Sequence, residues 1–119
     1  MNRDGTLAYD RHRLVELFGD DPVTLAEVER DFVETARLAE REIAGTADLG
    51  VIARAAHRLK GASGMIGAAA LQALASAIEA AARTADRDGL AGLAARLDPE
   101  VRRIARQAGI DPVTLSPRA

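Results

Sequence analysis

The chain has 119 residues, a length that accommodates one compact domain and is short for two. Hydrophobic residues make up 48% and charged residues 29%, with one tyrosine, two phenylalanines and no tryptophan, so the composition indicates a folded domain with an aliphatic core. The net charge is −2 and the basic residues are dispersed, which disfavours nucleic-acid binding. Because there is no cysteine, disulfides, thiolate metal sites and cysteine nucleophiles are excluded.

Hydropathy gives no sign of a membrane or export segment. No stretch approaches the roughly 18 consecutive apolar residues of a membrane span, and the start, MNRDGTLAYD, lacks the apolar run of a signal peptide. We therefore expect a cytoplasmic protein that does not enter a membrane.

Apolar residues recur at helical spacing throughout, and no stretch alternates convincingly with the period of a strand. A short first helix is expected over residues 10–18. After the break GDDP, Asp21 is a good N-cap and Pro22 suits the first helical position. The second helix is expected over Pro22–Ala44, with an apolar stripe of Leu25, Val28, Phe32, Thr35 or Ala36, Ala39 and Ile43.

Two further helices are separated by glycines. The third, capped by Thr46 or Asp48, is expected to fade over residues 64–67. The fourth is expected over residues 68–85, with a buried stripe of Leu71, Leu74, Ile78 and Ala81 or Ala82.

The last segment, residues 88–108, keeps its apolar phase on both sides of Pro99. Proline removes a backbone donor and clashes with the preceding turn, so we predict a kink there, or a restart capped by Asp98. Together the elements predict an all-α, antiparallel up-down four-helix bundle with a short accessory N-terminal helix. We expect one domain over residues 1–119, with its core over about 22–108 and a frayed tail over 109–119.

The stretch AAHRLKGASGMIGAAAL, residues 55–71, places a histidine, a lysine and three glycines in an alanine-rich helix. A glycine inside a helix costs roughly 1 kcal/mol relative to alanine. His57 lies two residues before the apolar Leu59, about 160° around the helix, and should therefore point away from the core. Its own face holds Arg54, Lys60, Gly61 and Gly64.

An exposed imidazole beside a lysine suits phosphoryl chemistry. Neutral imidazole is a good nucleophile near pH 7, Lys60 could balance the charge of an attached phosphoryl group, and bare glycines would let a partner approach. A solvated helix face with glycines that serve helix packing accounts for the same spacing. His12 stands in no motif, and the sequence holds no metal-ligand spacing, no Ser–His–acid set and no phosphate-binding loop. The chain is thus expected to need a partner for catalysis.

Residues 57–68 read HRLKGASGMIGA, with Leu71 and Glu79 downstream. This pattern resembles the hallmark H-x-L-K-G-x-[SA]-x-x-x-G-A of histidine-containing phosphotransfer (HPt) domains. The resemblance implies a phosphoacceptor role for His57 and stabilisation of the phosphoryl charge by Lys60. It implies room for a receiver's loops at Gly61. Further docking candidates by position are Arg54, Arg58 and Gly64, and the structural motif positions are Leu59, Ser63 and Gly67.

The expected function is that of a histidine phosphotransfer protein, which shuttles a phosphoryl group between receiver-domain aspartates in a two-component phosphorelay without kinase activity of its own. The implied partners are response-regulator receiver domains and a hybrid sensor histidine kinase, with Mg²⁺ on the receiver and no cofactor on this chain. We expect a monomer that binds neither nucleic acid nor membrane.

Three alternatives stay open from the sequence. The chain could bind and sequester a receiver without transfer, could be the phosphoacceptor domain excised from a larger chemotaxis-type or hybrid kinase, or could be an unrelated alanine-rich bundle. No dimerisation or ATP-binding domain follows before Ala119, which favours a stand-alone protein.

Overall fold

The computed structural model describes residues 7–111, which form six α-helices and no strand. None of these helices is both long and apolar enough to cross a membrane. The helices are α1 (Arg11–Phe18), α2 (Pro22–Ala44), α3 (Leu49–Met65), α4 (Ala69–Arg83), α5 (Arg87–Ala94) and α6 (Leu97–Gln107).

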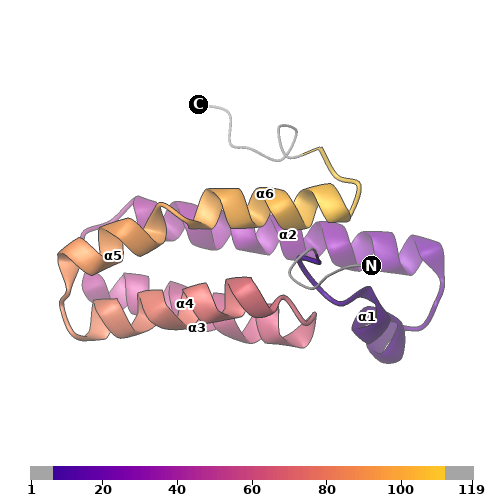
Figure 1. The fold of residues 1–119 in the computed structure, drawn as a ribbon, viewed down its shortest axis with the longest axis horizontal. Helices are drawn as coiled ribbons and strands as arrows, with labels where there is room; N and C mark the ends of the chain where they lie inside the picture. Colours follow the sequence, from indigo (N-terminus) through magenta and orange to yellow (C-terminus); the bar gives the residue numbers. More distant parts are fainter. Residues whose placement is uncertain (1–6, 112–119) are drawn as a thin grey trace.

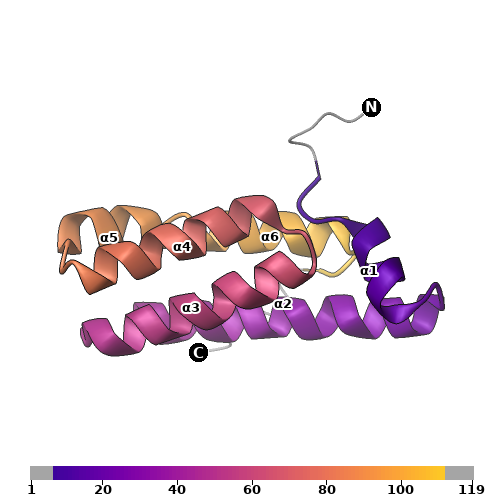
Figure 2. The same ribbon diagram turned by 90° about the horizontal axis from the view of Figure 1, so that it is seen from below.

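The bundle has four helical segments: α2, α3, α4 and the consecutive pair α5 and α6. In Figures 1 and 2, α2, α3, α4 and the α5–α6 pair run side by side along the long axis, while α1 lies across one end. The helix α2 packs against α3 and α6, and α4 packs against α3 and α5. Short connections reverse the chain between neighbours, so the predicted all-α up-down bundle with an accessory N-terminal helix is confirmed.

The predicted helix starts and apolar stripes are largely those of the structure. Asp21 caps α2 with Pro22 in its first turn, and Asp48, rather than Thr46, caps α3 by accepting hydrogen bonds from the amides of Gly50 and Val51. The second and fourth predicted stripes are buried, apart from Val28, which is half-buried, and Thr35, which is exposed and leaves its place in the stripe to Ala36. The core is therefore aliphatic and alanine-rich, as the composition indicated.

The break in the last segment was predicted at the wrong place. It lies at Ala95 and Arg96, and Arg96, not Asp98, is the N-cap of α6. Pro99 stands in the first turn of α6, where backbone N–H groups have no intrahelical partner, so it neither kinks the helix nor loses a hydrogen bond. The ordered chain also continues past residue 108, because Ile110 is buried and its amide donates to the carbonyl of Ala105. Residues 112–119 of the predicted tail lie outside the described part.

The N-terminal segment is attached to the bundle by specific hydrogen bonds. The Tyr9 hydroxyl is buried and donates to Glu29 of α2, and burial together with this carboxylate raises the pKa of Tyr9. The amide side chain of Gln107 on α6 accepts from Ala8 N at 2.6 Å and donates to Tyr9 O at 3.0 Å. The segment therefore links α2 to the end of α6.

Helix α1 is also fastened to the end of α3, and this contact requires Gly67. The Asp10 amide donates to Ile66 O at 3.1 Å, and Arg13 Nε donates to Met65 O at 2.9 Å, so two carbonyls at the end of α3 find partners in the accessory helix. Gly67 has φ +71°, and a Cβ added there would lie 2.7 Å from Asp10 Cβ. Both the left-handed backbone and the close approach favour glycine.

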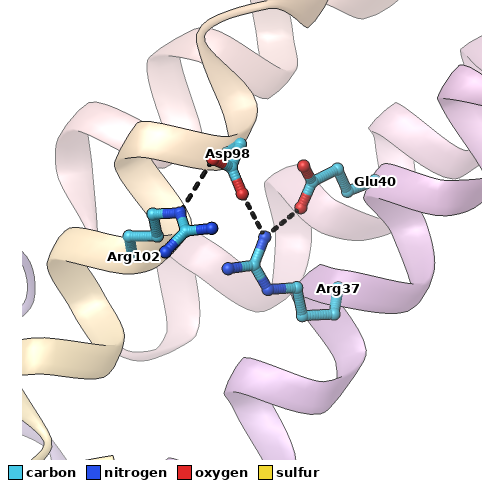
Figure 3. Close-up of polar contacts among 4 residues, drawn as sticks. All are labelled: Arg37, Glu40, Asp98 and Arg102. Carbon is cyan, nitrogen blue, oxygen red and sulfur yellow. Dashed lines mark hydrogen bonds and ion pairs between the residues drawn. The ribbon is translucent and has the colours of Figure 1, made fainter. Parts of the chain in front are cut away.

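A buried arginine joins α2 to α6 (Figure 3). Arg37 is only 4% exposed, and its Nη1 donates to Glu40 Oε1 at 2.6 Å and to Asp98 Oδ1 at 2.7 Å. Asp98 Oδ2 accepts from Arg102 Nε at 2.8 Å. The apolar period of α2 did not predict this charge inside the bundle.

Candidate functional site

His57 occupies the middle of α3 on its solvent side. Leu59, two residues later, is 1% exposed, whereas the His57 side chain is 63% exposed, so the predicted direction of the imidazole is confirmed. His57 Nδ1 lies 3.1 Å from Glu79 Oε2 on α4. With the carboxylate accepting, Nδ1 carries the proton of the neutral ring, and the lone pair is then on Nε2.

Glu79 is the centre of an ion cluster between α3 and α4. The residue is only 7% exposed, yet its carboxylate has three partners. Oε2 accepts from Arg83 Nη2 at 2.7 Å and faces His57 Nδ1, while Oε1 lies 3.0 Å from Lys60 Nζ. Hydrogen bonds from Arg83, then from Lys60 and His57, outweigh burial and lower the pKa of Glu79 to about 2. Glu79 is therefore ionised at neutral pH.

Cationic side chains surround the imidazole. A shallow pocket of about 260 Å³ is lined by His57 and by the arginines Arg54, Arg58 and Arg83. Arg58 Nη2 is paired with Glu42 Oε1 at 2.6 Å. The opening beside His57 is thus a cationic one, suited to an anionic group.

The two glycines on the histidine's face differ. A Cβ added to Gly61 would meet nothing within 4 Å, so this position is bare, as the spacing predicted. A Cβ on Gly64 would lie 2.6 Å from Gln72 Nε2, because the Gln72 amide from α4 covers that glycine. The open surface next to His57 is therefore at Gly61, whereas the docking candidate Gly64 is covered by the Gln72 side chain.

The remaining motif residues support α3 from within. Leu59 is buried in the core, and Ser63, fully buried, donates to Leu59 O at 2.7 Å and so satisfies its hydroxyl inside its own helix. Gly67 forms the turn at which α1 meets the bundle. Within residues 7–111, no group of three His, Cys, Asp or Glu residues could hold a metal ion.

A family model described as "Hpt domain" matches residues 22–107. The chain belongs to the Hpt domain family. The match spans α2 to α6 and leaves the accessory helix α1 outside it. Searches of curated proteins and of solved structures found no match. Membership makes the chain a histidine-containing phosphotransfer domain of the phosphorelay type, a family that interacts with response-regulator receiver domains.

Two residues of the Hpt domain's cluster had no assigned role in the sequence analysis. Glu79 was quoted only as part of the resembling pattern, and Arg83 was not singled out. The i,i+4 spacing of an acid and a base on α4 was a usable signal for an ion pair. What local spacing could not show is that this pair faces His57 and Lys60, which lie on α3.

His12, the second histidine, lies apart from the cluster on α1. Its side chain is 81% exposed, and its Nε2 lies 3.7 Å from Glu16 on the same helix. Within the described residues, no contact connects His12 to α3 or α4. It is therefore a suitable control for His57, because it is a histidine that lies outside the cluster.

Proposed function

We propose that this Hpt domain shuttles phosphoryl groups between receiver aspartates, with His57 as the phosphoacceptor. The observation that carries the proposal is the pairing of His57 Nδ1 with the buried Glu79 carboxylate, while the side chain is 63% exposed. This pairing holds the proton on Nδ1 and leaves Nε2 as an accessible nucleophile.

The transfer step balances without an added acid or base. The Nε2 lone pair attacks the phosphorus of a receiver's aspartyl phosphate, the bond from phosphorus to the carboxylate oxygen breaks, and the aspartate leaves as a carboxylate. The product ring is a phospho-imidazolium that keeps its Nδ1 proton, and the Glu79 carboxylate faces this positive ring. The reverse step gives the phosphoryl group to the aspartate of a second receiver.

Lys60 and Gly61 assist in this proposal in different ways. Lys60, one turn after His57, keeps a cation next to the phosphoryl group and holds Glu79 in place through Oε1. Gly61 leaves the next turn open for the receiver's loops, and the receiver supplies Mg²⁺. Exposed Arg58 is a docking contact at the rim of the pocket. We expect the domain to act as a monomer.

The decisive experiment is transfer from an Asp-phosphorylated receiver to purified protein. We expect label on the wild type in an acid-labile, base-stable form, none on His57→Gln, and normal label on the matched control His12→Gln. Labelling of His57→Gln would contradict the assignment. Receiver binding without any label would instead support a module that sequesters receivers.

A second variant tests the bare position. Gly61→Leu places a large side chain where a Cβ meets nothing within 4 Å, so the helix keeps its stability while the receiver is obstructed. We expect weaker receiver binding and slower transfer at a thermal stability equal to or above that of the wild type, because leucine has a higher helix propensity than glycine. Transfer at the wild-type rate would show that the contact surface lies elsewhere.

A further inference from the structure

The cations around His57 are not equally available. Lys60 and Arg83 are both bound to the Glu79 carboxylate, and Arg58 is bound to Glu42. Arg54 lines the same pocket as His57, and its side chain forms no hydrogen bond or ion pair with any residue in the described range 7–111. It is therefore the one cation of this pocket and cluster whose charge is not already neutralised within the described structure.

The position of Arg54 allows it to reach the imidazole. It precedes His57 by three residues, so the two side chains share one face of α3. Its guanidinium now lies back along the helix over Gly50, where an added Cβ would be 3.5 Å from Arg54 Nη1. No residue in the range 7–111 forms a polar contact that holds the guanidinium there, and rotation of the long side chain brings it towards the imidazole ring.

The local charge is matched to a phosphoryl group. Four cations (Arg54, Arg58, Lys60 and Arg83) stand against two carboxylates (Glu42 and Glu79), which leaves two positive charges besides that of the phosphorylated ring. A phosphoryl group carries about −1.5 to −2 charges near pH 7 and offers three acceptor oxygens. The planar guanidinium donates two parallel hydrogen bonds to such oxygens.

We propose that Arg54 binds the phosphoryl group carried by His57 Nε2, in addition to any contact it makes with a partner protein. This inference rests on the proposed function of His57. The phosphoryl group recruits Arg54 because Lys60 and Arg83 already share the Glu79 carboxylate. Arg54 thereby stabilises the phosphorylated form of the domain relative to the free form.

The test follows the phosphoryl group itself, so that docking does not enter. The protein is phosphorylated with phosphoramidate, a small donor whose P–N bond breaks with release of ammonia, and the phosphoryl group is titrated by ³¹P NMR. A paired guanidinium favours the dianion, so Arg54→Gln raises the titration midpoint by about half a pH unit. In Arg54→Lys, which keeps the positive charge, the titration midpoint should stay close to that of the wild type.

The control is Arg30→Gln, which removes one positive charge from an exposed position on α2, away from the His57 pocket. We expect no change of midpoint for this variant and unchanged thermal unfolding for both. A midpoint in Arg54→Gln equal to that of Arg30→Gln would overturn the role of Arg54 and leave the function of His57 standing. Absence of any phosphohistidine in the wild type would overturn both.

Discussion

Gly61 lies inside α3 and Gly67 lies in the turn after it, and the structure predicts opposite effects for an alanine substitution at these two positions. Gly61 is in the interior of α3, and an added Cβ meets nothing within 4 Å. Gly61→Ala should therefore stabilise the protein by about 1 kcal/mol through helix propensity alone.

Gly67→Ala has two separate costs. Its φ of +71° is a left-handed conformation that costs an L-residue about 1–2 kcal/mol. The new methyl group would also lie 2.7 Å from Asp10 Cβ, so α1 must shift and weaken the hydrogen bond from the Asp10 amide to Ile66 O. We expect a loss of about 2 kcal/mol or more, which places the two variants about 3 kcal/mol apart.

Urea unfolding and thermal unfolding, both followed by circular dichroism, measure the two variants against the wild type. At about 4 °C per kcal/mol for a domain of this size, Gly61→Ala should melt about 4 °C higher and Gly67→Ala about 8 °C lower. Gly67→Ala at or above wild-type stability would refute the contact between α1 and the end of α3. Destabilisation by Gly61→Ala would refute the bare face beside His57.

Three further predictions concern Glu79, the Arg37–Asp98 ion pair and His57. Because the pKa of Glu79 is lowered to about 2 from an ordinary 4.5, its carboxylate stabilises the fold fully above about pH 4.5 and loses this effect as the pH falls towards 2. The stability gap between wild type and Glu79→Gln, measured by urea unfolding, should thus shrink over that window; a gap independent of pH would contradict the ion cluster. Asp98→Ala should cost about 2–3 kcal/mol, because buried Arg37 then keeps only Glu40 as a partner. Arg37→Met should cost less in the same urea series, since the carboxylates left behind, with side chains 45% and 21% exposed, can be hydrated; the reverse order would refute the burial argument. His57→Gln should stay within about 0.5 kcal/mol of the wild type, because an exposed side chain contributes little to packing, and a large drop in melting temperature would contradict its exposure.

The sequence predicted the helices well because their apolar stripes and caps are local features. The stripe of α2 and the Asp21–Pro22 start are examples, since both depend on neighbours within a turn or two. The direction of His57 followed from the same periodicity. The break in the last segment was predicted at the wrong place because proline either interrupts a helix or occupies its first turn. Only the tertiary structure decides between these two positions for Pro99.

Polar contacts between helices could not be predicted in the same way. Arg37 lies inside the bundle because Asp98, 61 residues away in the chain, reaches it from α6. Glu79 similarly meets His57 across 22 residues, and Gln72 covers Gly64 from the neighbouring helix. These pairings depend on the relative rotation of packed helices, which the apolar period restricts without specifying partners.

We propose that Glu79 keeps the proton on Nδ1, so that His57 reacts through Nε2. The most direct measurement is heteronuclear ³¹P–¹H–¹⁵N NMR of the phosphorylated, ¹⁵N-labelled protein, which identifies the nitrogen bonded to phosphorus. We expect a single phosphohistidine, at His57, with phosphorus on Nε2 and a protonated Nδ1. Phosphorus on Nδ1, or on any residue other than His57, would contradict this role of Glu79 and His57.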